Sequence, residues 1–253
     1  MRNEVVTAFK LKAYKYPSSI YCGMILYPQS SLQTVSAELS RFVKTCDDPK
    51  IAMHAFVTNK DSPFFSHCVN GDRAIGLVLY DANGPEIARQ RFEWALNIEG
   101  AHPMISEMTL SQVHAMQNGS HAGKIDSWST GALIKEIDEQ MLVRASAWFD
   151  KLIDTDASLA TGSYALIEVM QRLTFDSAGP SERAFPVKGQ RHVVQLGTGF
   201  TAGHSFPEKK ALELLREGTK MCAPNHIASE YLPNWIEPSF MDAAEVSEKN
   251  KEP

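Results

Sequence analysis

The 253-residue sequence lacks the residue spacings that mark disulfide frameworks and metal sites. Its four cysteines are far apart and form no C-x-x-C pair, so we expect free thiols in a reducing compartment. Its eight histidines include no H-E-x-x-H motif, which argues against a zinc-hydrolase site. These absences predict a cytoplasmic protein that holds no metal.

Basic blocks and long apolar runs are missing as well. The net charge is −5, and Lys and Arg are spread along the chain, so neither a nucleic acid nor a membrane surface is an expected partner. No run approaches the roughly 18 apolar residues that span a bilayer. The first 16 residues have no apolar segment typical of a secretory signal. A dinucleotide fingerprint and a phosphate-binding loop are also absent, so this sequence shows no cofactor-binding motif.

The composition is that of a globular protein, with 43% hydrophobic and 22% charged residues. Segments of strand character alternate with segments of amphipathic helical periodicity. This order predicts an α+β fold, a large, mostly antiparallel sheet with helices packed on one face. The domain is expected to cover residues 1–242, with a disordered tail at 243–253. The predicted strands are 4–14, 19–27, 50–58, 64–69, 74–80, 103–110, 125–134, 163–173 and 190–201, and the predicted helices are 30–46, 85–97, 136–153 and 207–221.

The stretch 161–202 is the most informative part of the sequence. Two strand-like runs, 163–173 and 190–201, flank a polar loop that is too long for a tight hairpin, and such loops are often functional. Because side chains alternate along a strand, Tyr164 and Glu168 share a face with Leu166 and Met170. A sheet face with ionisable groups among apolar ones could be the wall of a binding pocket. It could also be the wet face of an ordinary antiparallel sheet.

On the second run, His192 shares a face with Val194 and Leu196, while Gln195 points the other way. His192 is a candidate proton shuttle or a solvent-facing strand residue. A Glu168 carboxyl among apolar side chains would favour its neutral form, which suits acid–base work near neutrality. The alternative is a glutamate at the wet edge of a strand.

The N-terminal region resembles a segment of the berberine-bridge-enzyme-like FAD-linked oxidases, which belong to the vanillyl-alcohol-oxidase superfamily. In that family a G-V-V-T motif follows the flavin domain, and a strand ending in Tyr-Pro and a helix come after it. The matching residues here are Asn3, Val5, Val6, Thr7, Phe9, Gly23, Tyr27 and Pro28.

The resemblance continues through residue 238. The sequence DSWSTGALIKEI resembles the family's strand before its long helix, and Ala184-Phe185-Pro186 with Gln195 resembles a loop and strand of its substrate domain. The sequence EYLPNWIEP resembles the family's Tyr-x-Asn-Tyr segment, which lies close to the flavin.

The sequence also departs from the family pattern. It begins where the family's FAD-binding domain ends, so the resemblance covers the substrate-binding part, and no His or Cys here matches the residues that hold the flavin covalently. Gln171-Arg172 replace the usual Gly-Gly pair, and Pro233 is inserted before Trp235. We therefore expect a substrate domain that needs a flavin domain in trans, and a sheet face that a flavin-domain chain or a second copy would cover.

The resemblance implies that this sheet orients a phenol, alcohol, sugar or alkaloid while hydride passes to FAD. Glu168 or Tyr164 is then the candidate base, with His192 as a proton shuttle. Substrate contacts are expected from Gln195 and Trp128 on the strands and from a lid formed by Tyr231, Asn234 and Trp235. As alternatives, Trp128 lies in the core and the lid segment only caps it.

Three kinds of function remain open from the sequence. The first is an FAD-linked oxidoreductase of natural-product metabolism, complemented by a flavin domain. The second is a cofactor-free isomerase or cyclase that uses the retained pocket. The third is a non-catalytic binding module or gene fragment.

Overall fold

A computed structural model describes residues 7–11, 15–59, 73–116, 125–171, 173, 192–201 and 207–224. Seven strands form one sheet in the order β4-β1-β3-β2-β6-β7-β5, and every pair of neighbours is antiparallel. The strands are β1 (Ile20–Tyr27), β2 (Ile51–Asn59), β3 (Arg73–Asp81), β4 (His102–Met108), β5 (Ile125–Ile134), β6 (Tyr164–Val169) and β7 (His192–Thr201).

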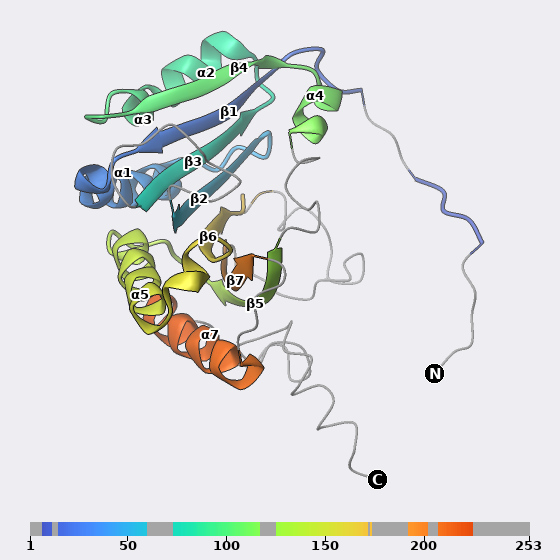
Figure 1. The fold of residues 1–253 in the computed structure, drawn as a ribbon. Helices are drawn as coiled ribbons and strands as arrows, with labels where there is room; N and C mark the ends of the chain where they lie inside the picture. The colour runs from blue at the N-terminus through green and yellow to red at the C-terminus, as the bar shows by residue number, and fades with distance from the viewer. Residues whose placement is uncertain are drawn as a thin grey trace.

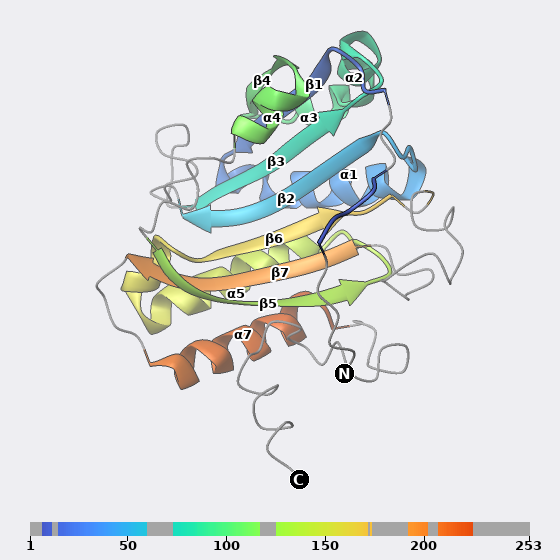
Figure 2. The same cartoon turned by 90° about the vertical axis from the view of Figure 1, so that its right-hand side faces the viewer.

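The longer helices pack on one face of this sheet (Figure 1). Turned by 90°, the molecule presents the opposite face, with α5 and α7 behind the strands (Figure 2). The predicted α+β architecture, with an antiparallel sheet and helices on one face, is therefore confirmed. The helices are α1 (Leu32–Thr45), α2 (Pro85–Arg91), α3 (Glu93–Leu96), α4 (Leu110–Ala115), α5 (Met141–Thr155) and α7 (Glu208–Cys222), with short 3₁₀ turns η1 (Gln29–Ser31) and η2 (Ala157–Ala160).

Helical periodicity explains how α5 and α7 cover the sheet. The core positions predicted for the helix at 136–153 are all buried, and Trp148 is 1% exposed. The Trp148 indole Nε1 donates a hydrogen bond of 2.9 Å to the Leu214 carbonyl of α7. This bond satisfies the one polar atom of a large apolar side chain, so burying the ring costs little. The confirmed core positions are Ile137, Met141, Ala145, Trp148 and Leu152.

Several element boundaries differ from those predicted. Residues 7–11 form no strand, and Phe9 and Leu11 are 81% and 84% exposed, because no neighbouring strand pairs with them in the described part of the chain. The helix predicted at 85–97 breaks at Phe92 into α2 and α3. As a result Ile87, predicted to point inward, is 51% exposed, while Phe92 is fully buried.

The helix predicted from residue 136 begins at Met141 instead. Asp138 accounts for the delay, since its carboxylate accepts a hydrogen bond from the Gln140 backbone and pairs with Arg144. Such aspartate side chains favour a turn over a continuous helix. The strand predicted at 64–69 and the tail 243–253 lie outside the described residues.

Candidate functional site

The side chains of β6 divide strictly between the two faces of the sheet. Ala165, Ile167 and Val169 are buried in the core beneath the helices. Tyr164, Leu166 and Glu168 alternate with them and are half-buried. They lie on the face opposite α1, α5 and α7, which we call the helix-free face because these three long helices do not cover it; the short helix α4 lies on this side near β4 (Figure 2). The alternation predicted for this strand is confirmed.

Glu168 stands at the centre of a polar cluster on the helix-free face. Its direct strand partners are His54 on β2 and Val193 on β7. Gln195 lies one diagonal step away, since its own partner is Leu166, and diagonal neighbours are within reach of long side chains. The Gln195 Nε2 donates a hydrogen bond of 2.8 Å to the Glu168 Oε1. That bond fixes the orientation of the carboxyl group.

Tyr164 occupies the same face, at the far end of β6. Its ring lies against Gly197, its strand partner, and a Cβ added to that glycine would be 2.3 Å from the ring Cε1. The missing side chain at position 197 thus lets the ring lie close to the sheet. Burial raises the pKa of Tyr164 above its usual value, and the nearby Glu168 charge raises this pKa further. The phenol is therefore neutral at physiological pH and can donate a hydrogen bond.

His54 completes the cluster and was not among the residues predicted from the sequence. Burial lowers the pKa of its imidazole below 6.5, and the opposing effect of Glu168 raises it. The sequence signal that marks it is its position in IAMHAFVTN, where it alternates with buried Met53 and Ala55. The cluster therefore consists of His54, Tyr164, Glu168 and Gln195.

Two predicted site residues lie on the opposite face of the sheet. His192 is 1% exposed, so the solvent-facing position considered for it is wrong, and its Nδ1 accepts a hydrogen bond of 3.2 Å from the Met170 backbone. Trp128 packs against Phe200, with ring centroids 5.7 Å apart, at the edge of the core. Neither side chain joins the cluster. The predicted lid residues Tyr231, Asn234 and Trp235 lie outside the described residues.

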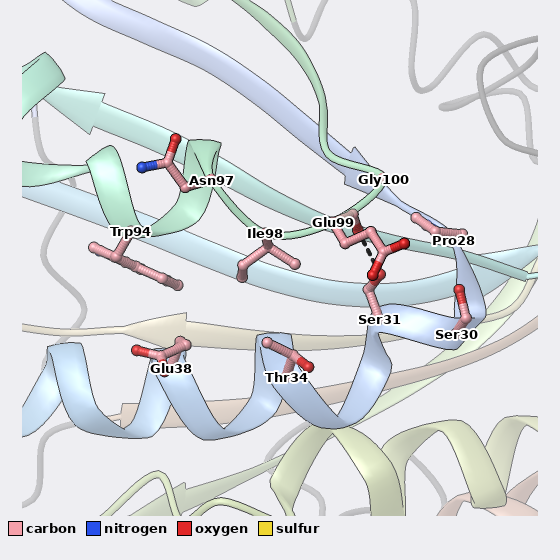
Figure 3. A pocket seen from close by; sticks show the side chains of 10 residues that line it. All are labelled: Pro28, Ser30, Ser31, Thr34, Glu38, Trp94, Asn97, Ile98, Glu99 and Gly100. Atoms are coloured by element: carbon pink, nitrogen blue, oxygen red, sulfur yellow. Dashed lines mark hydrogen bonds between the residues drawn. The ribbon is translucent and has the colours of Figure 1, made fainter.

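The cavity beside α1 is also separate from the cluster. It has a volume of about 670 Å³ and lies between α1 and the segment after α3 (Figure 3). The Glu38 carboxylate in its wall is already paired with Arg41 at 2.8 Å, and Ser31 donates to the Glu99 carbonyl at 2.7 Å. The second cavity, about 310 Å³, lies near Asp138 and Arg144. The residues that line these two cavities include no member of the cluster.

Metal clusters and membrane-spanning helices are two other features that bear on function. Within the described ranges, no group of three or more His, Cys, Asp or Glu side chains is arranged to hold a metal ion. In the same part of the chain, no helix is long and apolar enough to cross a bilayer.

The sequence matches no protein-family model and no curated protein, but the fold matches known structures. The alignment with 6-hydroxy-D-nicotine oxidase from Arthrobacter nicotinovorans covers 95% of this chain and 50% of that enzyme, at a TM-score of 0.62 and 17% sequence identity. The alignment with berberine bridge enzyme from Eschscholzia californica covers 85% of this chain and 42% of that enzyme, at a TM-score of 0.56 and 9% sequence identity. A third match is GilR, an oxidoreductase that catalyses the terminal step of gilvocarcin biosynthesis. That alignment covers 81% of this chain and 42% of GilR, at a TM-score of 0.58 and 15% sequence identity.

These similarities establish that the chain has the fold of one part of these enzymes. The chain spans half or less of the length of each of the three proteins. The rest of each known protein has no counterpart in the alignment.

Proposed function

We propose that this chain is the substrate-binding part of an FAD-linked oxidoreductase of natural-product metabolism, acting in the cytoplasm with a flavin domain supplied in trans. The observation that carries the proposal is the Glu168 carboxyl group, held by Gln195 and flanked by His54 on the helix-free face. The fold shared with three oxidases and oxidoreductases supports it. One of these proteins oxidises a nicotine derivative and another catalyses the terminal step of gilvocarcin biosynthesis, which favours a small organic substrate.

The helix-free face fits one part of FAD better than the other. Tyr164, lying close to the sheet over Gly197, together with neighbouring apolar side chains, offers a surface suited to a planar ring. The register places no Lys or Arg on this face within the described strands, whereas a pyrophosphate needs positive charge or clustered backbone N–H groups. The residues therefore fit the flavin ring and its substrate, and the phosphates would be held by another domain.

The chemistry on this chain is proton transfer and orientation. When bound, FAD would accept the hydride. Glu168 would take the proton that leaves a substrate O–H or N–H group, since a half-buried carboxylate with one oxygen fixed by Gln195 keeps the other available. Tyr164 would donate a hydrogen bond that orients the substrate. Leu166 between them would limit the access of water.

The test combines this chain with its flavin partner. A tagged chain produced in its native cells should co-purify with flavin absorbance, and a panel of phenols, alcohols, sugars and alkaloids should bleach that absorbance anaerobically. Glu168→Gln should retain the flavin and slow the bleaching by a factor of about 10² to 10⁴, the usual contribution of a general base. Bleaching at the wild-type rate would remove Glu168 from this role.

The isolated chain provides a second test. After incubation with excess FAD and gel filtration, it should retain no flavin, because the described face offers no phosphate contacts. Retention near one equivalent would show that the cofactor site lies on this chain.

A specific observation favours one alternative, a cofactor-free isomerase or cyclase. Tyr164 and Glu168, an acid and a base, lie on one face of the sheet and both belong to this chain. Turnover of a natural product by the colourless chain alone would support this alternative. A chain that binds neither flavin nor substrate would instead be a binding module or gene fragment.

A further inference from the structure

His54 and Glu168 are far apart in the sequence, and the pairing of their strands brings them together. The two residues are direct partners in the antiparallel ladder of β2 and β6, where directly opposite Cβ atoms lie about 4.5–5.5 Å apart. Both point from the helix-free face and both are half-buried. The two side chains interact electrostatically.

The surroundings leave few other groups that could act on His54. Its partner on the other side, across β3, is Val78, which is uncharged. Tyr80 on β3 and Tyr164 on β6 are the nearby phenols on this face. Within the described residues, Glu168 is the charged group that acts on the imidazole. Burial is therefore the larger influence on the pKa of His54, and the Glu168 charge opposes it.

We propose that His54 is a positioning residue that acts through Glu168, receiving the proton that Glu168 takes from the substrate and so restoring the carboxylate. The inference rests on the proposed role of Glu168 as the base. It also assigns a function to a histidine that faces the cluster from a strand far away in the sequence.

The transfer conserves atoms and charge. The O–H bond on the Glu168 carboxyl breaks and an N–H bond forms on the neutral imidazole, so a carboxylic acid and an imidazole become a carboxylate and an imidazolium. The two side chains are not hydrogen-bonded to each other in this structure, so the proton would pass after a side-chain rotation or through one water molecule.

Two opposing effects prepare His54 for this role. Burial lowers the pKa of the imidazole, so the ring is neutral and able to accept a proton at neutral pH. The carboxylate formed on Glu168 attracts the imidazolium and raises this pKa, so the proton is held briefly instead of returning to the substrate.

The test is a histidine NMR titration of the full chain, which requires neither substrate nor flavin. The His54 signal is assigned by its loss in His54→Gln. In Glu168→Gln the pKa of His54 should fall by about one unit, the size of shift that a neighbouring opposite charge produces. The signal of His114, exposed on α4, serves as the internal reference.

Glu107→Gln is the matched control, because it removes a carboxylate from the edge strand β4, far from β2 in the sheet order. It should leave the His54 titration unchanged. If Glu168→Gln shifts His54 no more than Glu107→Gln does, or shifts its pKa upward, the proposal is overturned. Absence of flavin in the co-purification would overturn the proposed function and leave this titration unaffected, so the two failures are distinguishable.

Discussion

Gly218 lies where α7 crosses Trp148, and replacing it tests the packing that supports the sheet. An added Cβ would be 2.4 Å from the Trp148 Nε1 and 2.7 Å from the Leu196 Cδ1. In an unconstrained helix, Gly→Ala stabilises by about 1 kcal/mol. Here overpacking costs about 1–3 kcal/mol, and disturbing the buried indole hydrogen bond costs about 1 kcal/mol more. We expect Gly218→Ala to destabilise the fold by about 2 kcal/mol.

Urea unfolding followed by circular dichroism measures this change, with a double-mutant cycle as the control. Trp148→Phe removes the Nε1 and the atoms nearest to position 218. On that background Gly218→Ala should keep only its close contact with the Leu196 Cδ1, so it should destabilise the fold by at least about 1 kcal/mol less than in the wild type. If the substitution destabilises the fold equally in both backgrounds, Trp148 does not set the constraint at Gly218 and the reasoning is wrong.

Three other predictions concern a buried ion pair, pH and association. Asp81 is fully buried and pairs with Arg91, so Asp81→Asn should lower the free energy of unfolding by about 3 kcal/mol in urea titrations. Since the folded-state pKa of His54 is lowered, the unfolded chain binds its proton more readily, and stability should fall as the pH drops below 6.5; His54→Gln should flatten that fall in a pH series of thermal melts. Light scattering at micromolar concentration should show the wild type as a dimer or a larger complex through the helix-free face, and Leu166→Asp should dissociate it, because covering several hundred Å² of apolar surface is worth on the order of 10 kcal/mol before association costs.

Each of these predictions has a control and a contrary outcome. Glu107→Gln breaks an exposed contact with Arg89 at 3.5 Å and should change the free energy of unfolding by less than about 1 kcal/mol. If Asp81→Asn lowers the free energy of unfolding by no more than Glu107→Gln does, the burial of Asp81 does not strengthen its contribution to stability. A pH series in which His54→Gln melts like the wild type would exclude His54 as the source of the acid sensitivity. Ile87→Asp, on exposed α2, should not alter the mass, and a monomeric wild type would refute association through the helix-free face.

The fold could be predicted because its local patterns agree with its packing. The apolar positions of the α5 segment recur at helical spacing, and Trp148 and Leu152 are buried as that spacing requires. The break at Phe92 could not be predicted from the same periodicity, since Ile87 and Phe92 fit one continuous helix equally well. Contacts between distant segments decided the outcome there, with the fully buried Phe92 packed against Phe42 of α1.

The site could be predicted only within single strands. Alternation placed Tyr164 and Glu168 on one face of β6, and His192 and Gln195 on opposite faces of β7, and both assignments are confirmed. Alternation does not determine how two strands joined by a long loop are aligned, and a shift of one residue would have brought His192 instead of Gln195 to Glu168.

His54 shows the same limit on a larger scale. It belongs to a strand that the sequence predicts well, but β2 and β6 are neighbours in space with three strands between them in chain order. Nothing in the local pattern of either strand selects that pairing. The pairing belongs to the tertiary fold, in which α1 and α5 pack on each other and the Leu142 backbone N–H donates a hydrogen bond of 3.3 Å to the Ser36 hydroxyl. The helices that precede β2 and β6 in the chain therefore contact each other on the side of the sheet opposite His54 and Glu168. A local pattern does not encode such a contact between distant segments, so neither strand alone could predict the His54–Glu168 pair.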